Sequence, residues 1–319
     1  MPVNVPLTLS AAGSSVVLPL RGAPRRRAFE PQFRALACSL GACGPRASAR
    51  EVISRFNNNK TVRLVWIGTP RSRPIGSRPP NRCVCVIKNN ETILDVFIRS
   101  RAYMPLHTLL AAAGRQEIDR ARLKLALQFM RAVGPEYSGI FNRAGLTRDR
   151  FHAQVFIAIT PLRIAIQSRR SQNRWKRIGA GVEASVLEDW PMSAIAFRGR
   201  TPGAVADKVA VAATALRRMR LTYDLTFHYA DGKLWVVVFA RRASSDDEWG
   251  TYSPERKQLG KFGALELSGV IVSVRSKPVF RAFAENPTEL GRRYRRALLD
   301  MSVADVLDRL MGMVAARRD

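Results

Sequence analysis

An alternation of apolar and polar residues between Thr147 and Ile157 predicts a β-strand. Successive side chains of a strand point to opposite faces, so this strand has one apolar face and one polar face. The apolar face consists of Phe151, Ala153, Val155 and Ile157. The polar face consists of Arg150, His152 and Gln154. A cation, an imidazole and an amide on one face are suited to binding a phosphate beside a nucleophile, whereas a hydrogen-bonded neutral histidine is the plainer interpretation of His152.

Further strands and a helix are predicted upstream of this strand. Runs of apolar and β-branched residues predict strands at 62–67, 83–87, 93–98 and 137–141. Helical spacing of apolar residues predicts an amphipathic helix over 116–133, which Gly134 should end. The pattern therefore predicts an antiparallel sheet with a packed helix, and a loop at 142–147 leads into the strand of His152.

The second part of the chain follows the same plan. The pattern predicts a strand at 193–197, a helix that begins after Thr201, and a hairpin whose turn is Asp231 and Gly232. The last predicted elements are a turn and strand at 263–270 that could close the site, and helices that begin at Asn286 and near Ser302, the latter with a capping-box-like sequence.

A weak internal repeat accompanies this plan. Segment 137–142 is similar to 223–228, and 152–156 is similar to 235–239. Only the first copy carries a histidine on the equivalent strand, so we expect His228 to be structural. The predicted fold class is α+β, with two pseudo-symmetric halves in which helices pack on antiparallel sheets.

Composition suggests three segments. Residues 1–48 contain a single acidic residue, Glu30, among many Ala, Ser, Gly and Pro, which predicts a flexible basic N-terminal extension. We expect the first half at 49–182, and the second half with the C-terminal helices at 183–319.

The charge of the chain is strongly unbalanced. Its 53 Lys and Arg against 25 Asp and Glu give a formal net charge of +28. This favours an anionic partner, and nucleic acid, nucleotide phosphates and an acidic membrane surface would all be attracted by the same field. A GC-rich genome could also enrich arginine without any binding role, and no helix-turn-helix, RNP-type or zinc-finger sequence is present. No acidic residue occurs from Phe151 through Val182, so the cations between Arg163 and Arg177 either bind phosphate or form a solvated loop.

Cysteine spacing, hydropathy and the motif content of the sequence argue against a metal site, a membrane span and a nucleoside triphosphatase. Cys38, Cys43, Cys83 and Cys85 lack paired Cys-x2-Cys spacing, so we predict no metal site and reduced thiols in a cytoplasmic protein. No apolar run approaches the roughly 20 residues that span a membrane. No phosphate-binding loop of the nucleoside triphosphatases is present, and we predict no cofactor.

The stretch from Phe141 to Gln154 resembles the active-site stretch of the histidine-triad-related nucleotidyltransferases and phosphorylases. That group includes galactose-1-phosphate uridylyltransferase, the GDP-hexose phosphorylases and diadenosine tetraphosphate phosphorylase. Their pattern is an Asn, a loop of small residues and His-x-His-x-Gln. The second His falls on His152 and the Gln on Gln154, while Arg150 stands at the first His. The likeness covers roughly residues 50 to 305.

This resemblance implies two histidine-triad-like halves and a covalent nucleotidyl-histidine intermediate. His152 and Gln154 would be catalytic, Gln154 by hydrogen-bonding a phosphate oxygen. The residues expected to bind substrate phosphate are Asn142, Gly145, Thr147 and Arg150. Arg150 either binds phosphate bidentately, or lowers the pKa of His152 and occupies space that the substrate needs.

Two functions follow from the resemblance and the charge. The first is nucleotidyl transfer from a nucleotide-sugar or dinucleotide, most simply by a nucleoside-diphosphate-hexose phosphorylase acting on a GDP-sugar, with inorganic phosphate or a sugar phosphate as the second substrate. The alternative is a catalytically degenerate, basic nucleotide- or nucleic-acid-binding protein on the same scaffold. The sequence leaves open whether the protein is a homodimer.

Overall fold

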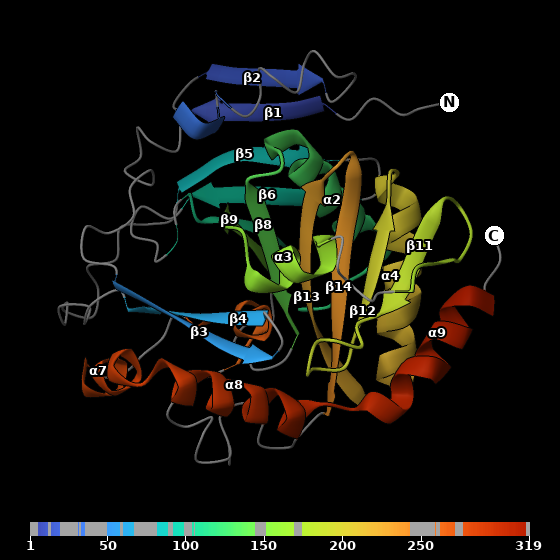
Figure 1. Ribbon diagram of the computed structural model, residues 1–319. Helices are drawn as coiled ribbons and strands as arrows, with labels where there is room; N and C mark the ends of the chain where they lie inside the picture. Colours follow the sequence, from blue (N-terminus) through green and yellow to red (C-terminus); the bar gives the residue numbers. More distant parts are fainter. Residues whose placement is uncertain are drawn as a thin grey trace.

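The computed structural model describes most of the chain in fifteen ranges. These are residues 6–11, 14–19, 31, 33–35, 50–57, 60–66, 82–88, 92–98, 104, 106–143, 151–168, 174–242, 259, 262–271 and 277–316. They form a large sheet, a small sheet and the helices that cover them (Figure 1). Within these ranges, no helix is both long and apolar enough to cross a bilayer.

The large sheet has 12 strands in the order β10-β11-β12-β14-β13-β8-β9-β7-β6-β5-β1-β2. Adjacent strands pair antiparallel throughout. Its strands are β1 (Pro6–Ala11), β2 (Ser14–Pro19), β5 (Arg82–Lys88), β6 (Ile93–Ile98), β7 (Thr108–Ala112), β8 (Tyr137–Asn142), β9 (Phe151–Ile157), β10 (Lys176–Arg177), β11 (Val182–Val186), β12 (Ala194–Gly199), β13 (Leu221–Ala230) and β14 (Lys233–Arg242). Two of these strands, β1 and β2, lie within the stretch that we expected as an N-terminal extension.

One face of the large sheet is covered by α2 (Arg120–Val133), α4 (Pro202–Arg218) and α9 (Leu307–Ala316). Figure 1 shows α4 and α9 side by side over one end of the sheet. Helix α2 begins later than predicted, because the Asp119 carboxylate accepts a hydrogen bond of 2.7 Å from the backbone N–H of Arg122 and so caps the helix. Gly134, with φ of 106°, ends it as predicted.

The opposite face carries the small sheet β15-β4-β3 and the remaining α-helices. These elements are β3 (Arg50–Asn57), β4 (Lys60–Trp66), β15 (Val270–Ile271), α3 (Pro161–Gln167), α6 (Ala264–Leu267), α7 (Lys277–Glu285) and α8 (Pro287–Met301). The 3-10 helix η1 (Ala304–Val306) precedes α9 and packs on the same face as α9. Helix α8 lies directly against β3 (Figure 1), where a Cβ on Gly291 would come within 2.1 Å of the carbonyl oxygen of Arg55. A glycine is therefore required for this close approach.

A central row of paired residues crosses eight neighbouring strands of the large sheet. From β11 to β6 it consists of Ser185, Ala196, Val237, Thr226, Ile140, Gln154, Leu109 and Phe97. The row is centred where Thr226 of β13 pairs with Ile140 of β8. On either side of this pair the chain runs in the same order, two strands, a helix and two strands: β6, β7, α2, β8, β9 and then β11, β12, α4, β13, β14.

Two predictions about local structure were wrong. Segment 263–270 is mainly the helix α6 rather than a strand, because the Glu266 carboxylate accepts a hydrogen bond of 2.9 Å from the N–H of Gly263 and closes one helical turn. Ser302 does not begin a capping box, since its hydroxyl bonds the hydroxyl of Ser193 and the cap of η1 is Val303. The predicted helix at Asn286 and the hairpin around Gly232 are confirmed.

Candidate functional site

His152 and Gln154 lie on the half-exposed face of β9. Phe151, Ala153 and Val155 are buried in the core beneath α2, as the alternation predicted. His152 and Gln154 therefore point to the other face, towards the side on which α6 and the small sheet lie.

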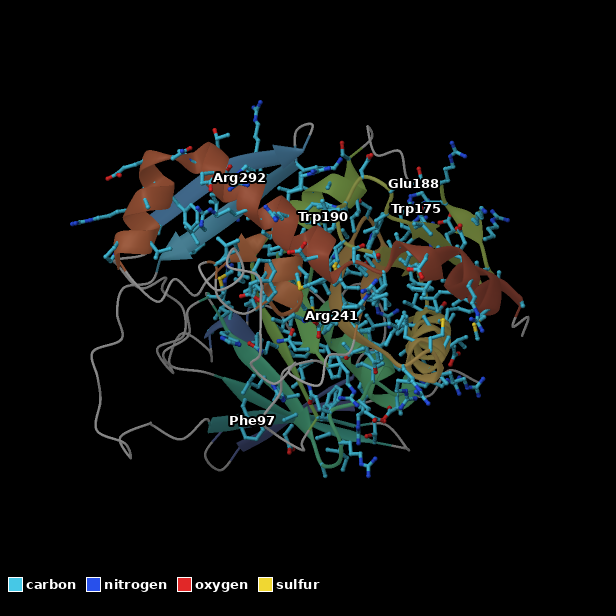
Figure 2. The ribbon with its side chains drawn as sticks, turned by 90° about the horizontal axis from the view of Figure 1, so that it is seen from below. Phe97, Trp175, Glu188, Trp190, Arg241 and Arg292 are labelled. Carbon is cyan, nitrogen blue, oxygen red and sulfur yellow. The ribbon has the colours of Figure 1, made fainter. Side chains whose placement is uncertain are left out.

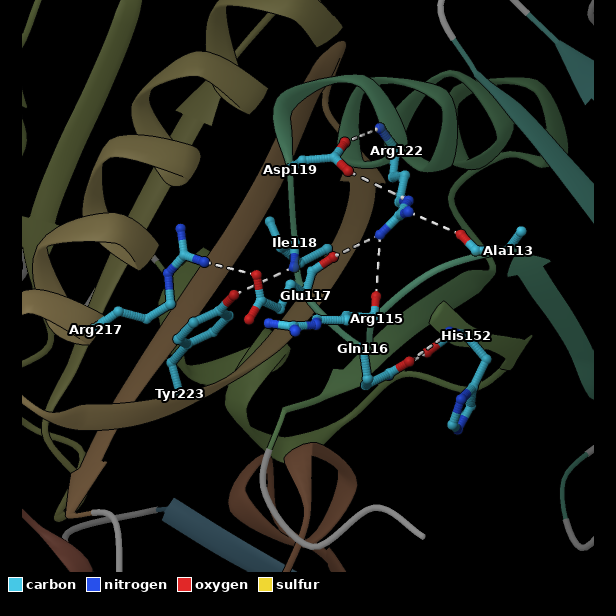
Figure 3. A network of polar contacts seen from close by, with 10 residues as sticks. All are labelled: Ala113, Arg115, Gln116, Glu117, Ile118, Asp119, Arg122, His152, Arg217 and Tyr223. Carbon is cyan, nitrogen blue, oxygen red and sulfur yellow. Dashed lines mark hydrogen bonds and ion pairs between the residues drawn. The ribbon is translucent and has the colours of Figure 1, made fainter. Parts of the chain in front are cut away.

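The backbone of His152 is fixed by the buried side chain of Gln116. The Gln116 side-chain carbonyl oxygen accepts a hydrogen bond of 2.6 Å from the N–H of His152, and the Gln116 amide donates to the carbonyl oxygen of His152 at 2.8 Å (Figure 3). The same amide also donates to the carbonyl oxygen of Asn142 at 3.1 Å. The backbone pairing between β8 and β9 ends at Ile140 and Gln154. The Gln116 side chain thus bridges the two strands at Asn142 and His152. The segment 143–150, which joins β8 to β9 there, is called the site loop.

The loop before α2 holds Gln116 in place. The Arg122 guanidinium donates to the carbonyl oxygens of Ala113 at 2.8 Å and Arg115 at 3.0 Å (Figure 3). It also lies over the Phe151 ring. Gly114 has φ of 93°, and a Cβ there would lie 2.7 Å from Arg122. The loop conformation is therefore specified by one arginine and one glycine.

Asn142 connects the site to α6. Its side-chain oxygen accepts a hydrogen bond of 2.7 Å from the N–H of Ala264. A Cβ on Gly263 would lie 2.8 Å from the same oxygen, so the glycine permits this contact. The N–H of Ala264 lies in the first turn of α6, where backbone N–H groups have no acceptor within the helix, and the side-chain oxygen of Asn142 accepts its hydrogen bond. The sequence did not indicate this role.

A buried ion pair lies beneath the start of the site loop. Asp224 is fully buried on β13 and pairs with the Arg241 guanidinium at 2.9 Å. The other oxygen of Asp224 accepts a hydrogen bond of 2.8 Å from the N–H of Arg143, and Arg241 also donates to the carbonyl oxygen of Phe262 at 3.0 Å. Figure 2 shows Arg241 in the middle of the molecule. The pair joins β13 and β14 to the loop and to the segment before α6.

Three of the predicted phosphate-binding residues, Gly145, Thr147 and Arg150, lie outside the described residues. The structure brings His152, Gln154 and Asn142 to neighbouring ends of β8 and β9 on one face. Among the described residues, no three His, Cys, Asp or Glu side chains gather in a way that could hold a metal ion.

The expectation for the basic segment after β9 needs correction at Arg163. This residue is 5% exposed in α3 and its guanidinium donates to the carbonyl oxygen of Tyr137 at 3.3 Å. Burial lowers the pKa of Arg163. Thr160 caps α3, with its hydroxyl accepting from the N–H of Arg163. Arg163 therefore belongs to the core, whereas Lys176 and Arg177 are exposed on β10.

His228 occupies a buried position in the second half of the sheet. It is 3% exposed, its ring stacks on Trp235 with centroids 5.8 Å apart, and its Nε2 lies 3.3 Å from the amide of Gln167. Burial, with a smaller effect of the Arg163 charge, lowers the pKa of His228 well below 6.5. These contacts suit a neutral imidazole that packs between strands.

This buried imidazole should make stability depend on pH. Below pH 6.5 the unfolded chain protonates His228 and the folded chain does not, so the free energy of unfolding should fall by up to about 1.4 kcal/mol per pH unit. Urea unfolding at several pH values from about 7 down to 5.5 should show a steeper loss for the wild type than for a His228→Gln variant. Equal pH slopes for the two proteins would contradict a neutral, buried His228.

Solved structures provide the comparison that the sequence alone does not. No family model matches the chain, and no curated protein matches it. The crystal structure of yeast Ap4A phosphorylase Apa2 superposes with a TM-score of 0.58, over 87% of this chain and 94% of the yeast chain, at 13% sequence identity. The chain shares the fold of Ap4A phosphorylase. This confirms the predicted α+β fold class.

Two further yeast structures agree with this likeness. Apa2 in complex with Ap4A gives a TM-score of 0.58 at 12% identity, over 86% of this chain and 96% of the yeast chain. Apa2 in complex with AMP gives 0.55 at 12% identity, over 87% and 96% of the two chains.

Proposed function

We propose that this protein transfers a nucleotidyl group through His152. The observation that carries the proposal is the placement of His152 and Gln154, which are half-exposed on one face of β9 while Gln116 fixes the backbone of His152. The nucleophilic nitrogen must be held in line with the reacting phosphorus. A fixed backbone limits the positions of the side chain, so less conformational entropy is lost when the reactive geometry forms. The shared fold with Ap4A phosphorylase supports the same reaction class.

The reaction would proceed in two displacements. A ring nitrogen of His152 donates its lone pair to the α-phosphorus, and the bond from that phosphorus to the bridging oxygen breaks. The electrons of this bond leave on the nucleoside polyphosphate of a dinucleotide substrate, or on the sugar phosphate of a nucleotide-sugar. In the second step an oxygen of inorganic phosphate or a sugar phosphate attacks the same phosphorus and the phosphorus–nitrogen bond breaks. Gln154 and Asn142 would donate hydrogen bonds to the nonbridging oxygens during both steps.

The remaining roles follow the sequence pattern. Gly145 would let the loop backbone approach the phosphates, Thr147 would donate a hydrogen bond to a phosphate oxygen, and Arg150 would neutralise the phosphate charge. The second half would be a pseudo-symmetric copy that has lost the nucleophile, because Trp235 stands at the position that corresponds to His152.

Two substrate classes fit this reaction. Dinucleoside polyphosphates are favoured by the fold shared with yeast Apa2, which is an Ap4A phosphorylase and has been solved in complex with Ap4A. Nucleoside-diphosphate hexoses are favoured by the sequence resemblance. Both contain the phosphoanhydride that the mechanism needs.

A second function is favoured by the net charge of +28. A degenerate site on a basic scaffold would bind nucleotides or nucleic acid without transferring a nucleotidyl group. Such binding would weaken steeply with salt, because each neutralised phosphate releases counterions.

Intact-protein mass spectrometry distinguishes the two functions. Wild-type protein and a His152→Ala variant are incubated with a panel of nucleoside-diphosphate hexoses and dinucleoside polyphosphates. The proposed function predicts a mass increase of one nucleoside monophosphate on the wild type alone, and the increase identifies the base. No increase with any donor, together with salt-sensitive binding of nucleic acid, would favour the degenerate site.

A further inference from the structure

Two strands at equal distances from the central pair of the large sheet, β6 and β11, carry acidic residues at corresponding positions. In the row next to the central row, Asp95 of β6 pairs with Ala111, and Ala111 pairs with His152. On the other side of the sheet, Glu183 of β11 pairs with Arg198, and Arg198 pairs with Trp235. Counted from the central pair of strands, Glu183 corresponds to Asp95, Arg198 to Ala111 and Trp235 to His152.

In the second half this position is filled by the chain itself. The Arg198 guanidinium donates to both oxygens of Glu183, at 2.9 and 3.2 Å, and its plane lies over the Trp175 ring at 4.0 Å. Lys233 also bonds Glu183 at 2.9 Å, and these two cations hold the pKa of the carboxyl at about 2. Trp235 beneath them is only 4% exposed. A planar group with two parallel N–H donors thus occupies the space over this carboxylate.

Among the described residues, no side chain like Arg198 fills the same position in the first half. Ala111 presents only a methyl group where Arg198 stands in the second half, and Asp95, Ala111 and His152 are all half-exposed. Two strand spacings separate Asp95 from His152, which is about 10 Å. Phe97 and Leu109, also half-exposed, extend the same face next to Asp95. Figure 2 shows Phe97 and Trp175 far apart in the molecule.

We infer that Asp95 binds the Watson–Crick edge of a guanine base and makes the site selective for guanine nucleotides. This inference rests on the proposed function, because it places the nucleotide of that reaction across β7. The carboxylate of Asp95 offers only acceptors. Guanine presents two adjacent donors, N1–H and the N2 amino group, in the same fork that Arg198 presents to Glu183. Adenine presents one donor beside an acceptor, which a carboxylate repels.

The surroundings of Asp95 suit a base that lies over the sheet. Leu109 and Ala111 give an apolar floor, and Phe97 adds an aromatic ring on the same face. The nucleobase would then extend away from His152 while the α-phosphate remains beside it, so the row spans one nucleotide. In the second half, the corresponding carboxylate of Glu183 binds the planar guanidinium of Arg198, which stacks on Trp175.

Binding of nucleoside monophosphates to Asp95 variants tests the inference. Isothermal calorimetry measures Kd for GMP, IMP and AMP with wild type, Asp95→Asn and Asp95→Ala, after thermal unfolding has shown that the variants are folded. Wild type should bind GMP about 10- to 100-fold more tightly than AMP, as expected for a bidentate pair, with IMP between them. Both substitutions should weaken GMP binding and leave AMP binding within a few-fold, which removes the preference.

Several outcomes would overturn the inference. Equal affinities of wild type for GMP and AMP, or tighter binding of AMP, would remove the base preference. An equal loss for both nucleotides in the Asp95 variants, together with weak binding of 2′-deoxy-GMP to wild type, would place Asp95 at the ribose. If the wild type still forms the His152 adduct in these cases, only the base assignment fails; if it neither binds nucleotides nor forms the adduct, the proposed function fails with it.

Discussion

Replacing His152 by Ala should lower the rate of nucleotidyl transfer by at least about 10⁴-fold while Kd for the nucleotide changes by only a few-fold. The imidazole is the only protein group in the proposed mechanism that forms a bond to phosphorus, so its removal abolishes both displacements rather than weakening one interaction. Binding should persist because the polar groups around the nucleotide remain. Steady-state phosphorolysis and calorimetry on the same preparation measure the two effects separately.

Gln154→Ala is the matched control for this prediction. Gln154 lies two residues along the same strand and face, and it would contribute one hydrogen bond in the transition state. Its loss should lower kcat by about 10²- to 10³-fold, less than the loss of the nucleophile. A His152→Ala variant that retains more activity than Gln154→Ala would contradict the assignment of the nucleophile.

Replacing Asp224 by Ala should lower the free energy of unfolding by about 3–5 kcal/mol. The substitution leaves the charge of Arg241, which is 4% exposed, buried without its carboxylate, and it removes the acceptor for the N–H of Arg143. Arg143 is the first residue of the site loop, so the loss of this hydrogen bond should displace the loop and lower the activity as well. Urea unfolding followed by circular dichroism measures the stability.

Asp207→Ala provides the control for charge alone. Asp207 on α4 pairs with Arg120 on α2, but both side chains are exposed, at 39% and 61%. Solvent screens such pairs, so this change should cost less than about 1 kcal/mol. Similar losses for the two variants would show that the buried pair of Asp224 and Arg241 has no special role.

The elements with strong local signals were predicted from the sequence. The strand of His152 alternates from Phe151 to Val155, Gly134 ends α2 with φ of 106°, and the turn at Asp231 and Gly232 has φ of 50° and 73°. Each of these features depends on residues next to one another in the chain, so pattern and turn chemistry specify it.

The contacts that complete the site had no such signal. The spacing of apolar residues extends the predicted helix back to Gln116, so its role as a bridge between strands was hidden. Asp224 and Arg241 lie 17 residues apart and meet only through the pairing of β13 and β14. The correspondence of Asp95 with Glu183 depends on the register of several strand pairs, which no local pattern specifies.

The location of the covalent group tests the central claim most directly. Wild-type protein is incubated with a donor, digested at a pH that preserves the acid-labile phosphorus–nitrogen bond, and its peptides are sequenced by mass spectrometry. The account predicts one nucleoside monophosphate on His152, released when inorganic phosphate is added. A nucleotidyl group on any other residue, or none on a protein that turns over its substrate, would contradict it.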